Sequence, residues 1–294
     1  MKEQIIRFEA IKKSYSKIEA LKNISFSVPV GSIFGILGAN GSGKSTLMKI
    51  LPGLIKDWSG KIYYKDKNIK GNSSILKRDV GYLIESPTFY EYISAQKNLE
   101  MLARISNVDF KRIPYVLDLV ELKSRANDKV SDYSYGMKQR LGIAQVLLHN
   151  PQVVVLDEPN NGLDPNGISD MTKLIKQMQL DGKTVILSTH NLRDVEEICT
   201  DFVVFKNGES SDSISIKNLL IESKKWSIIA DNPESAIDVI KNNKSLSYLD
   251  RVNNKIFIES KLDISINDIN NLFKDLVVYN ICKESNLIDY FSHD

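Results

Sequence analysis

The chain has 294 residues, enough for one large domain and a smaller one, each with its own hydrophobic core. Its 39 Lys and Arg nearly balance its 37 Asp and Glu, and no run of like charge predicts a nucleic-acid partner. The two cysteines, Cys199 and Cys282, are too far apart for a CxxC metal or redox motif. The N-terminus lacks the apolar core of a signal peptide, and no run approaches the roughly 18 apolar residues of a membrane span, so we expect a cytoplasmic protein.

The N-terminal part of the sequence predicts two antiparallel strands, and after them a buried strand, a turn and a helix. Residues 5–10 and 20–28 are short and half apolar, with period-two alternation in the second, which indicates an antiparallel edge sheet. Residues 32–38, SIFGILG, form a nearly continuous apolar run, as expected of a strand that is buried on both faces. A glycine-rich turn follows, and a helix is expected to begin at Ser45.

The middle of the chain predicts a helical insertion and then a return to strands. Apolar residues recur three and four apart over about 86–150, which indicates a helical subdomain. Strand patterns at 153–159 and 184–190 enclose a helix around 171–179, and a last strand ends near Gly208. Strands that alternate with helices predict a mostly parallel sheet, so the fold class is α/β.

The C-terminal part predicts a separate unit. Residues 210–217, SSDSISIK, are rich in serine, and we expect a linker over 210–222. The patterns that follow it alternate in the order β-α-β-β-α-β, which is the split ferredoxin-like arrangement. We therefore predict an α/β domain over 1–209 and a small α+β domain over 223–294.

A phosphate-binding loop is predicted at residues 38–46, GANGSGKST, because this GxxxxGK[ST] pattern lies between a buried strand and a helix. Its glycines allow successive N–H groups to face phosphates, and the helix N-terminus adds partial positive charge. Lys44 is expected to reach the β and γ phosphates, and the Ser45 hydroxyl to bind Mg²⁺. The predicted ATP-binding residues of this loop are Gly38, Asn40, Gly41, Ser42, Gly43, Lys44, Ser45 and Thr46.

Two acids follow at the end of the predicted strand VVVLDE. Asp157 is placed to face the metal, and Glu158 is placed to orient or deprotonate the attacking water. A phosphate-binding loop together with these two acids is found in many P-loop proteins, from helicases to kinases. Further motifs are needed to identify the class of P-loop protein.

Residues 133–140, YSYGMKQR, resemble the signature LSGGQ of ABC ATPases, with Tyr135 in place of glycine and Met137 in place of glutamine. In that family the segment covers the ATP that is held by the opposite subunit. The resemblance therefore implies an ABC ATPase fold, a P-loop NTPase domain that works as a dimer. It also implies that Ser134 and Gly136 contact the γ-phosphate bound to the partner.

Further motifs of the same family follow in order. NNGLDP at 160–165 resembles the D-loop, which implies that Asp164 lies at the dimer interface near the nucleotide. His190, after TVILST, resembles the switch histidine that contacts the γ-phosphate, so Glu158 and His190 are the predicted catalytic residues. Tyr15 matches the aromatic residue that stacks on adenine in this family, although a tyrosine packed at a strand edge is the alternative.

Glu85, in VGYLIESPTFY, stands where ABC ATPases usually have a glutamine that bridges Mg²⁺ and the helical subdomain. A carboxylate can still bind the metal or its water, so Glu85 joins Ser45 and Asp157 as a predicted Mg²⁺ ligand. Together, Glu85, the signature and the short C-terminal unit resemble the ATPases of bacitracin-type and lantibiotic-protection transporters, which are bacterial exporters of peptide antibiotics.

The resemblance implies an ATPase that uses ATP and Mg²⁺ and powers export through a separate membrane permease. Its expected partners are a second ATPase subunit, either an identical copy or a close paralogue, and the permease, which would hold it at the inner face of the membrane. Two alternatives stay open. One is an ABC ATPase for another substrate, such as a drug, lipid or polysaccharide. The other is a soluble ABC ATPase without a transport role, although the chain has one P-loop and no sustained heptads.

Overall fold

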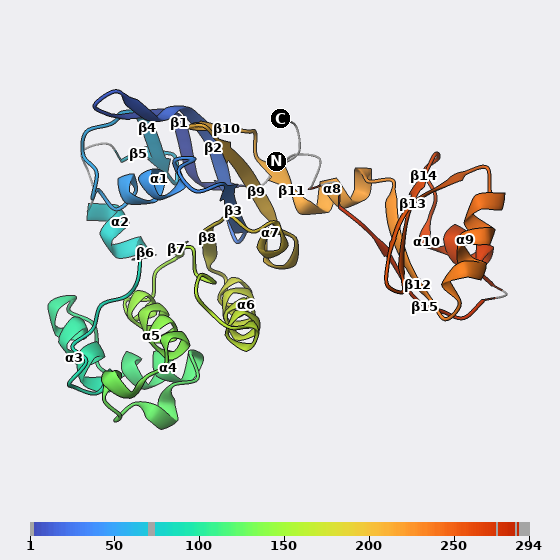
Figure 1. Ribbon diagram of the computed structural model, residues 1–294. Coiled ribbons are helices and arrows are strands. Elements are labelled where there is room, and N and C mark those ends of the chain that lie inside the picture. The colour runs from blue at the N-terminus through green and yellow to red at the C-terminus, as the bar shows by residue number, and fades with distance from the viewer. Residues whose placement is uncertain (1–2, 70–73, 275, 286, 288–294) are drawn as a thin grey trace. The chain divides into compact units, whose positions relative to one another are not determined.

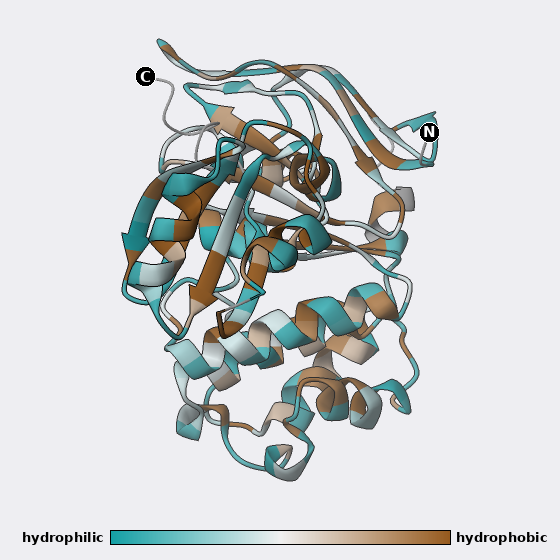
Figure 2. Cartoon of the chain, turned by 90° about the vertical axis from the view of Figure 1, so that its right-hand side faces the viewer, coloured by the Kyte–Doolittle hydropathy of each residue, from teal (hydrophilic) through white to brown (hydrophobic). Residues whose placement is uncertain are grey.

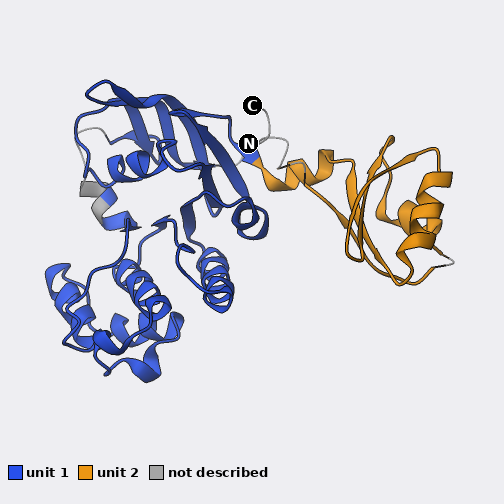
Figure 3. Ribbon diagram, viewed as in Figure 1, with its two compact units in different colours: residues 1–214 blue, residues 215–294 orange. Residues whose placement is uncertain are grey.

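The computed structural model describes residues 3–69, 74–274, 276–285 and 287. The chain divides into two compact units, residues 1–214 and 215–294, which have different colours in Figure 3. The first unit contains two sheets and the second contains one, and each unit has its own cluster of buried apolar side chains.

An antiparallel sheet forms one layer of the first unit. Its strand order is β2-β1-β4-β5, and the strands are β1 (Gln4–Tyr15), β2 (Ile18–Pro29), β4 (Ser59–Tyr64) and β5 (Lys67–Asn68). Buried and exposed side chains alternate along parts of β1 and β2, because one face of this sheet packs on the core. The predicted antiparallel edge is therefore confirmed.

A mostly parallel sheet forms the second layer, with the order β10-β9-β3-β8-β7-β6. The pairs β9–β3, β3–β8, β8–β7 and β7–β6 are parallel, and β10 is antiparallel to β9. Its inner strands are buried at nearly every position, as expected when helices or a second layer cover both faces. The strands are β3 (Ile33–Gly38), β6 (Val80–Leu83), β7 (Val153–Asp157), β8 (Thr184–Thr189), β9 (Asp201–Lys206), β10 (Glu209–Ser210) and β11 (Ile214–Ser215), which also pairs with β9.

Strand β3 shows how the two faces of this sheet are covered. The Phe34 ring stacks on Phe26 of β2 with centroids 5.4 Å apart, so this face packs on the antiparallel sheet. Gly35 points the other way, where a Cβ would lie only 2.8 Å from the Cys199 sulfur at the end of α7. The helices of this part are α1 (Lys44–Ile50), α2 (Ser74–Asp79), α6 (Pro165–Leu180) and α7 (Leu192–Ile198).

A helical subdomain lies between β6 and β7 in sequence, as predicted. It contains α3 (Ala95–Ile105), α4 (Arg112–Leu119) and α5 (Tyr135–Leu147), with short 3₁₀ turns at Lys123–Arg125 and Val130–Asp132. Hydrophilic residues (teal) and hydrophobic residues (brown) both occur along these helices in Figure 2, as expected of surface helices with one buried face. Within the described residues, no helix is both long and apolar enough to cross a membrane.

The second unit has the predicted β-α-β-β-α-β order. Its antiparallel sheet has the order β13-β14-β12-β15, and buried side chains such as Trp226 and Ile240 form its core. The elements are α8 (Ile216–Glu222), β12 (Lys225–Ala230), α9 (Pro233–Asn242), β13 (Leu246–Val252), β14 (Lys255–Ser260), α10 (Ile266–Leu272) and β15 (Val278–Lys283).

The segment 210–222, which we expected to be a linker, contains regular structure. Helix α8 fills its second half, and the short strand β11 lies just before it. The serine content concealed a helical repeat, because Ile216 and Leu219 lie three residues apart and are buried on one side of the helix. The boundary between the two units falls inside this segment, after Ile214.

Phe34 should be among the residues on which the first unit depends for stability. Its ring is fully buried and stacked on Phe26, so Phe34→Ala should lower the free energy of unfolding by about 3–5 kcal/mol. Urea unfolding followed by circular dichroism measures this change. Ile105→Ala is the control, because that side chain is 81% exposed and its loss should cost less than about 0.5 kcal/mol. Equal effects of the two substitutions would contradict the assignment of Phe34 to the core.

Candidate active site

Three neighbouring strands of the parallel sheet end at the same edge, and polar residues follow each of them. Gly38 ends β3, Asp157 ends β7 and Thr189 ends β8, and these strands are hydrogen-bonded in the order β3-β8-β7. The carboxyl ends of parallel strands meet at one edge, and open α/β sheets bind ligands there. This edge therefore brings together segments that are up to 150 residues apart in sequence.

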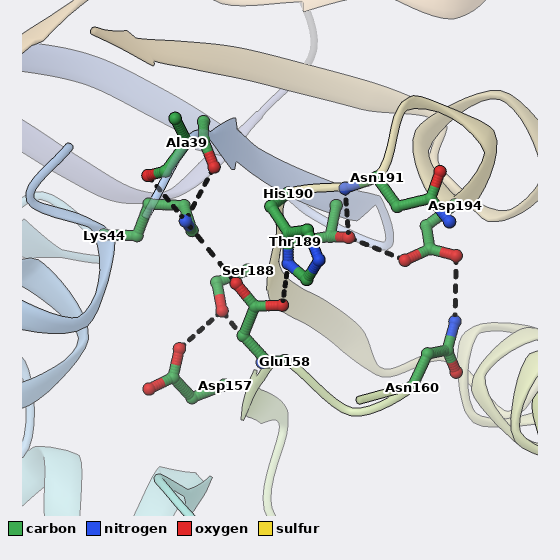
Figure 4. Close-up of polar contacts among 11 residues, drawn as sticks. Ala39, Lys44, Asp157, Glu158, Asn160, Ser188, Thr189, His190, Asn191 and Asp194 are labelled. Atoms are coloured by element: carbon green, nitrogen blue, oxygen red, sulfur yellow. Dashed lines mark hydrogen bonds and ion pairs between the residues drawn. The ribbon is translucent and has the colours of Figure 1, made fainter. Parts of the chain in front are cut away.

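The loop after β3 wraps around the side chain of Lys44. The Lys44 Nζ donates hydrogen bonds to the carbonyl oxygens of Gly38 at 2.7 Å and Ala39 at 3.1 Å (Figure 4). The side chain is only 5% exposed, so its charge is held at a fixed place beneath the loop. Gly43 is needed at the start of α1, because its φ is +110° and a Cβ there would lie 2.6 Å from the Ala20 carbonyl oxygen.

The remaining residues of the predicted phosphate loop surround this lysine. Gly38 and Ser42 are buried, whereas Asn40 and Gly41 are exposed at the tip of the loop. Ser45 and Thr46 follow Lys44 in the first turn of α1, and the Ser45 side chain is exposed. The structure thus brings the eight predicted loop residues into one turn.

Ser188 holds the two acids at the end of β7, Asp157 as its last residue and Glu158 directly after it. Its hydroxyl donates to Asp157 Oδ1 at 2.5 Å and accepts from the backbone N–H of Glu158 at 2.9 Å. Glu158 has a φ of +49°, so the backbone turns sharply directly after the strand. One hydroxyl from the neighbouring strand therefore sets the positions of both acids, and the sequence analysis did not identify it.

Glu158 lies between the buried lysine and the predicted switch histidine. Its Oε1 is 3.4 Å from Lys44 Nζ, and its Oε2 is 2.7 Å from His190 Nδ1 (Figure 4). Glu158 is mostly buried and His190 is half exposed, so the histidine ring lies on the open side of the cluster. The structure therefore joins Lys44, Glu158 and His190, which the sequence had predicted separately.

A second network joins the segments on either side of the histidine. Asp194 Oδ2 accepts a hydrogen bond from the Thr189 hydroxyl at 2.6 Å, and its Oδ1 accepts one from the Asn160 amide at 3.1 Å. The Thr189 hydroxyl also accepts from the backbone N–H of Asn191 at 3.0 Å. Asp194 thus connects the loop after Glu158 to the residues that flank His190. This role could not be predicted from the sequence, because an acid in the first turn of a helix is common.

The three predicted metal ligands supply the right kind of donor but are not all free. The Ser45 hydroxyl and the Asp157 and Glu85 carboxylates are oxygen ligands, which suit Mg²⁺. Glu85 Oε1, however, forms an ion pair with Lys49 Nζ at 2.6 Å. The hydrogen bond and the charge of Lys49 hold the pKa of the Glu85 carboxyl below its usual value, and the same hydrogen bond raises the pKa of Lys49.

No group of three or more His, Cys, Asp and Glu side chains forms a metal cage within the described residues. This arrangement fits Mg²⁺, because that ion keeps several waters and binds proteins through one or two side chains together with substrate phosphates. Ser45 and Asp157 are the residues that are open to such a role.

The residues predicted to contact a partner's nucleotide lie in a groove of about 350 Å³. Ser134 and Asp164 are the N-caps of α5 and α6, and they accept from the backbone N–H groups of Met137 and Gly167. The unusual Tyr135 packs on the loop between them, because a Cβ at Gly162 would lie 3.2 Å from its ring. This groove, which Gly136 also lines, shares no residue with the Lys44–Glu158–His190 cluster.

Tyr15 ends β1 and presents an open ring face. The side chain is 45% exposed, and the buried Lys13 places its Nζ 4.8 Å from the ring centroid. Lys13 is itself paired with Asp57 at 3.0 Å. An exposed aromatic ring can stack on a base, and the ring also packs beside Lys13 at the end of the strand.

Comparisons with known proteins agree with this site. A family model described as ABC transporter matches residues 21–161. The bacitracin transport ATP-binding protein BcrA of Enterococcus faecalis is 32% identical over 99% of this chain and 96% of its own length. The lantibiotic transport ATP-binding protein SrtF of Streptococcus pyogenes is 37% identical over 68% of this chain and 86% of its own length.

A solved structure agrees with the fold. A dimeric ATP-binding cassette in a post-hydrolysis state, bound to ADP and Pi, is 26% identical with a TM-score of 0.64, and the match covers 72% of this chain and 99% of that one. The chain belongs to the ABC transporter family and is an ATPase of that family, so the predicted fold class and activity are confirmed.

Asp194 should affect the rate of ATP hydrolysis more than nucleotide affinity. In Asp194→Asn the amide loses the charge and can no longer accept from both Thr189 and Asn160, so the loop around His190 loosens. We expect turnover to fall about tenfold with little change in KM for ATP. Phosphate-release kinetics test this, with Glu197→Gln on the exposed side of the same helix as the control. An unchanged turnover number would show that the network has no positioning role.

Proposed function

We propose that this chain hydrolyses Mg·ATP as part of a dimer and thereby powers the export of peptide antibiotics of the bacitracin or lantibiotic kind through a separate membrane permease. The observation that carries the hydrolytic part is the cluster in which Glu158 lies between Lys44 and His190. The match to BcrA along both units supports the choice of cargo, because it extends beyond the ATPase domain into the C-terminal unit.

Nucleotide binding would use the loop over residues 38–46 and the ring of Tyr15. The loop N–H groups and Lys44 would hold the phosphates, because the glycine-rich loop already encloses the buried Lys44 ammonium. Adenine would stack on the open face of Tyr15, an interaction that contributes about 1–3 kcal/mol per base in other systems. Ser45, Asp157 and Glu85 would hold Mg²⁺, which supplies charge neutralisation between the β and γ phosphates.

Hydrolysis would depend on Glu158 and His190. Glu158 can orient or deprotonate a water molecule, because its carboxylate is held by Lys44 on one side and His190 on the other. When Lys44 turns to the phosphates, Glu158 keeps its contact with His190, which stands at the open side of the cluster. The same histidine can then donate to the γ-phosphate.

A second ATPase subunit would complete the site. Ser134, Gly136 and Asp164 lie in a groove that shares no residue with the phosphate loop, and in the proposed dimer they would face the nucleotide or surface of the other chain. An identical copy or a close paralogue meets this need. The dimeric cassette that resembles this chain supports the arrangement.

The permease would dock on the helical subdomain at residues 87–98, the segment that follows Glu85. A groove of about 550 Å³, which residues 87–98 do not line, is formed by residues that include Tyr82 of β6, Leu102 of α3 and His149 after α5. Pro87 packs on Gly142 of α5, where a Cβ would lie 2.9 Å away, so the loop after Glu85 is tied to the signature helix. Docking would hold the chain at the inner face of the membrane.

Glu158→Gln should separate binding from hydrolysis. The amide keeps the shape of the side chain but cannot take a proton from water, so turnover should fall by about 100-fold or more. ATP binding should persist, because the lysine and the loop are unchanged. Phosphate release and binding of a fluorescent ATP analogue measure the two effects, and a variant with near wild-type turnover would remove Glu158 from the mechanism.

The choice of cargo is tested in cells. We expect that the chain, expressed with a permease encoded beside it, raises resistance to bacitracin or to a lantibiotic, and that Glu158→Gln abolishes the gain. The growth-inhibitory concentration of each peptide is the measurement. If the chain has normal ATPase activity and co-purifies with a permease but gives no resistance, peptide export is ruled out, and the interpretation as the ATPase subunit of a transporter is retained.

A further inference from the structure

The ion pair between Lys49 and Glu85 lies at the point where this chain differs from the usual ABC ATPase pattern. Glu85 replaces a neutral glutamine, and its carboxylate contacts the Lys49 ammonium at 2.6 Å. The Glu85 side chain is 69% exposed, and Lys49 is about one-third exposed. Surface pairs of this kind contribute little to folding, so a role in stability does not account for its position beside the phosphate loop.

Lys49 stands on the same face of α1 as Ser45. The two residues are four apart in the helix, and helical side chains lean toward the N-terminus, so the Lys49 chain points along α1 toward Ser45. The hydrogen bond with Glu85 is the largest cause of the raised pKa of Lys49, and the charge of Asp157 also raises it. The ammonium therefore lies within the field of two of the three proposed metal ligands.

The backbone brings Glu85 to the edge of the sheet where Asp157 lies. Strand β6 runs parallel to β7 with Leu83 beside Leu156, so the residues after each strand emerge at the same edge. Glu85 has a φ of +66°, a conformation that costs free energy for a residue with a side chain. A strained backbone that keeps the carboxylate at this edge is consistent with a functional position rather than a casual surface contact.

We propose that Lys49 is a tethered counter-ion that holds Glu85 in the nucleotide-free protein and releases it to Mg²⁺ when Mg·ATP binds. The idea rests on the proposed function, because it assumes that Ser45 and Asp157 hold the metal. A carboxylate at this position adds a negative charge close to the phosphates, and the Lys49 ammonium offsets that charge. Lys49 and the metal therefore compete for Glu85.

The experiment follows nucleotide binding rather than hydrolysis. Binding of fluorescent methylanthraniloyl-ATP is measured against Mg²⁺ concentration and in EDTA, for the full chain and for Lys49→Met, Lys49→Arg, Glu85→Gln and the double variant Lys49→Met/Glu85→Gln. Lys49→Met should lower the Mg²⁺ concentration at half-saturation about two- to fivefold, because the competitor for Glu85 is gone. It should also weaken metal-free nucleotide binding, because the Glu85 charge is no longer offset.

The two residues must also depend on each other. In the Glu85→Gln background, Lys49→Met should leave the Mg²⁺ concentration at half-saturation nearly unchanged. The single variant Lys49→Arg keeps the positive charge and should therefore bind nucleotide and Mg²⁺ like the wild type. Lys176→Met, at an exposed position of α6, controls for the loss of a positive charge elsewhere. Glu85→Gln alone should tighten metal-free binding, which gives a test even if Lys49→Met does not fold.

Equal shifts of the Mg²⁺ midpoint in the wild-type and Glu85→Gln backgrounds would overturn the proposal, as would a Lys49→Met variant that needs more Mg²⁺. Those outcomes leave the ATPase site intact. Failure of the wild-type chain to bind nucleotide in an Mg²⁺-dependent way would instead reject the proposed function itself.

Discussion

The parallel pairing of β3, β8 and β7 is the constraint on which the rest of the site depends. Because these strands are buried and in register, their last residues end at one edge with fixed spacing. A short segment after each strand is then enough to bring its functional residues to this edge: the phosphate loop after β3, Glu158 after β7 and His190 after β8. A slip of one residue in β7 would turn Asp157 to the other face of the sheet and separate it from Ser188.

Helix α1 carries two lysines whose positive charges are paired with carboxylates in the nucleotide-free protein. Its two lysines at this edge are each paired with an acid, Lys44 with Glu158 and Lys49 with Glu85. Both acids follow strands of the same sheet at positive φ, so the backbone rather than a long flexible side chain determines where the carboxylates lie. The negative charges of a nucleotide would therefore compete with the Glu158 and Glu85 carboxylates for the two lysine ammonium groups. In the proposed mechanism, each carboxylate that is released then has a role of its own in the reaction.

The sequence predicted those features that one continuous segment determines. The phosphate loop, the two acids that end VVVLDE and the β-α-β-β-α-β order of the C-terminal unit each depend on a local sequence pattern, and all three appear in the structure. Ser188, Asp194 and Lys49 were missed, because each acts on a residue that is distant in sequence and has a common structural explanation: a polar residue in a buried strand, an acid in a first helical turn and a lysine in a last one. Helix α8 was missed for a different reason, since the serine-rich segment before it hid a short apolar repeat.

The geometry of the groove also separates the roles of Ser134 and Asp164, which the sequence had grouped together. The Ser134 oxygen accepts a hydrogen bond from Met137, which leaves its O–H free to donate to an acceptor such as a phosphate oxygen. Asp164 has only acceptor atoms when ionised, and one of them is used by the Gly167 N–H. A carboxylate beside a phosphate is repelled, so Asp164 is better suited to fix the loop that faces the other chain. In the proposed dimer, contact with the partner's nucleotide would depend on Ser134 and on the N–H groups at the start of α5, because a helix N-terminus favours negative charge.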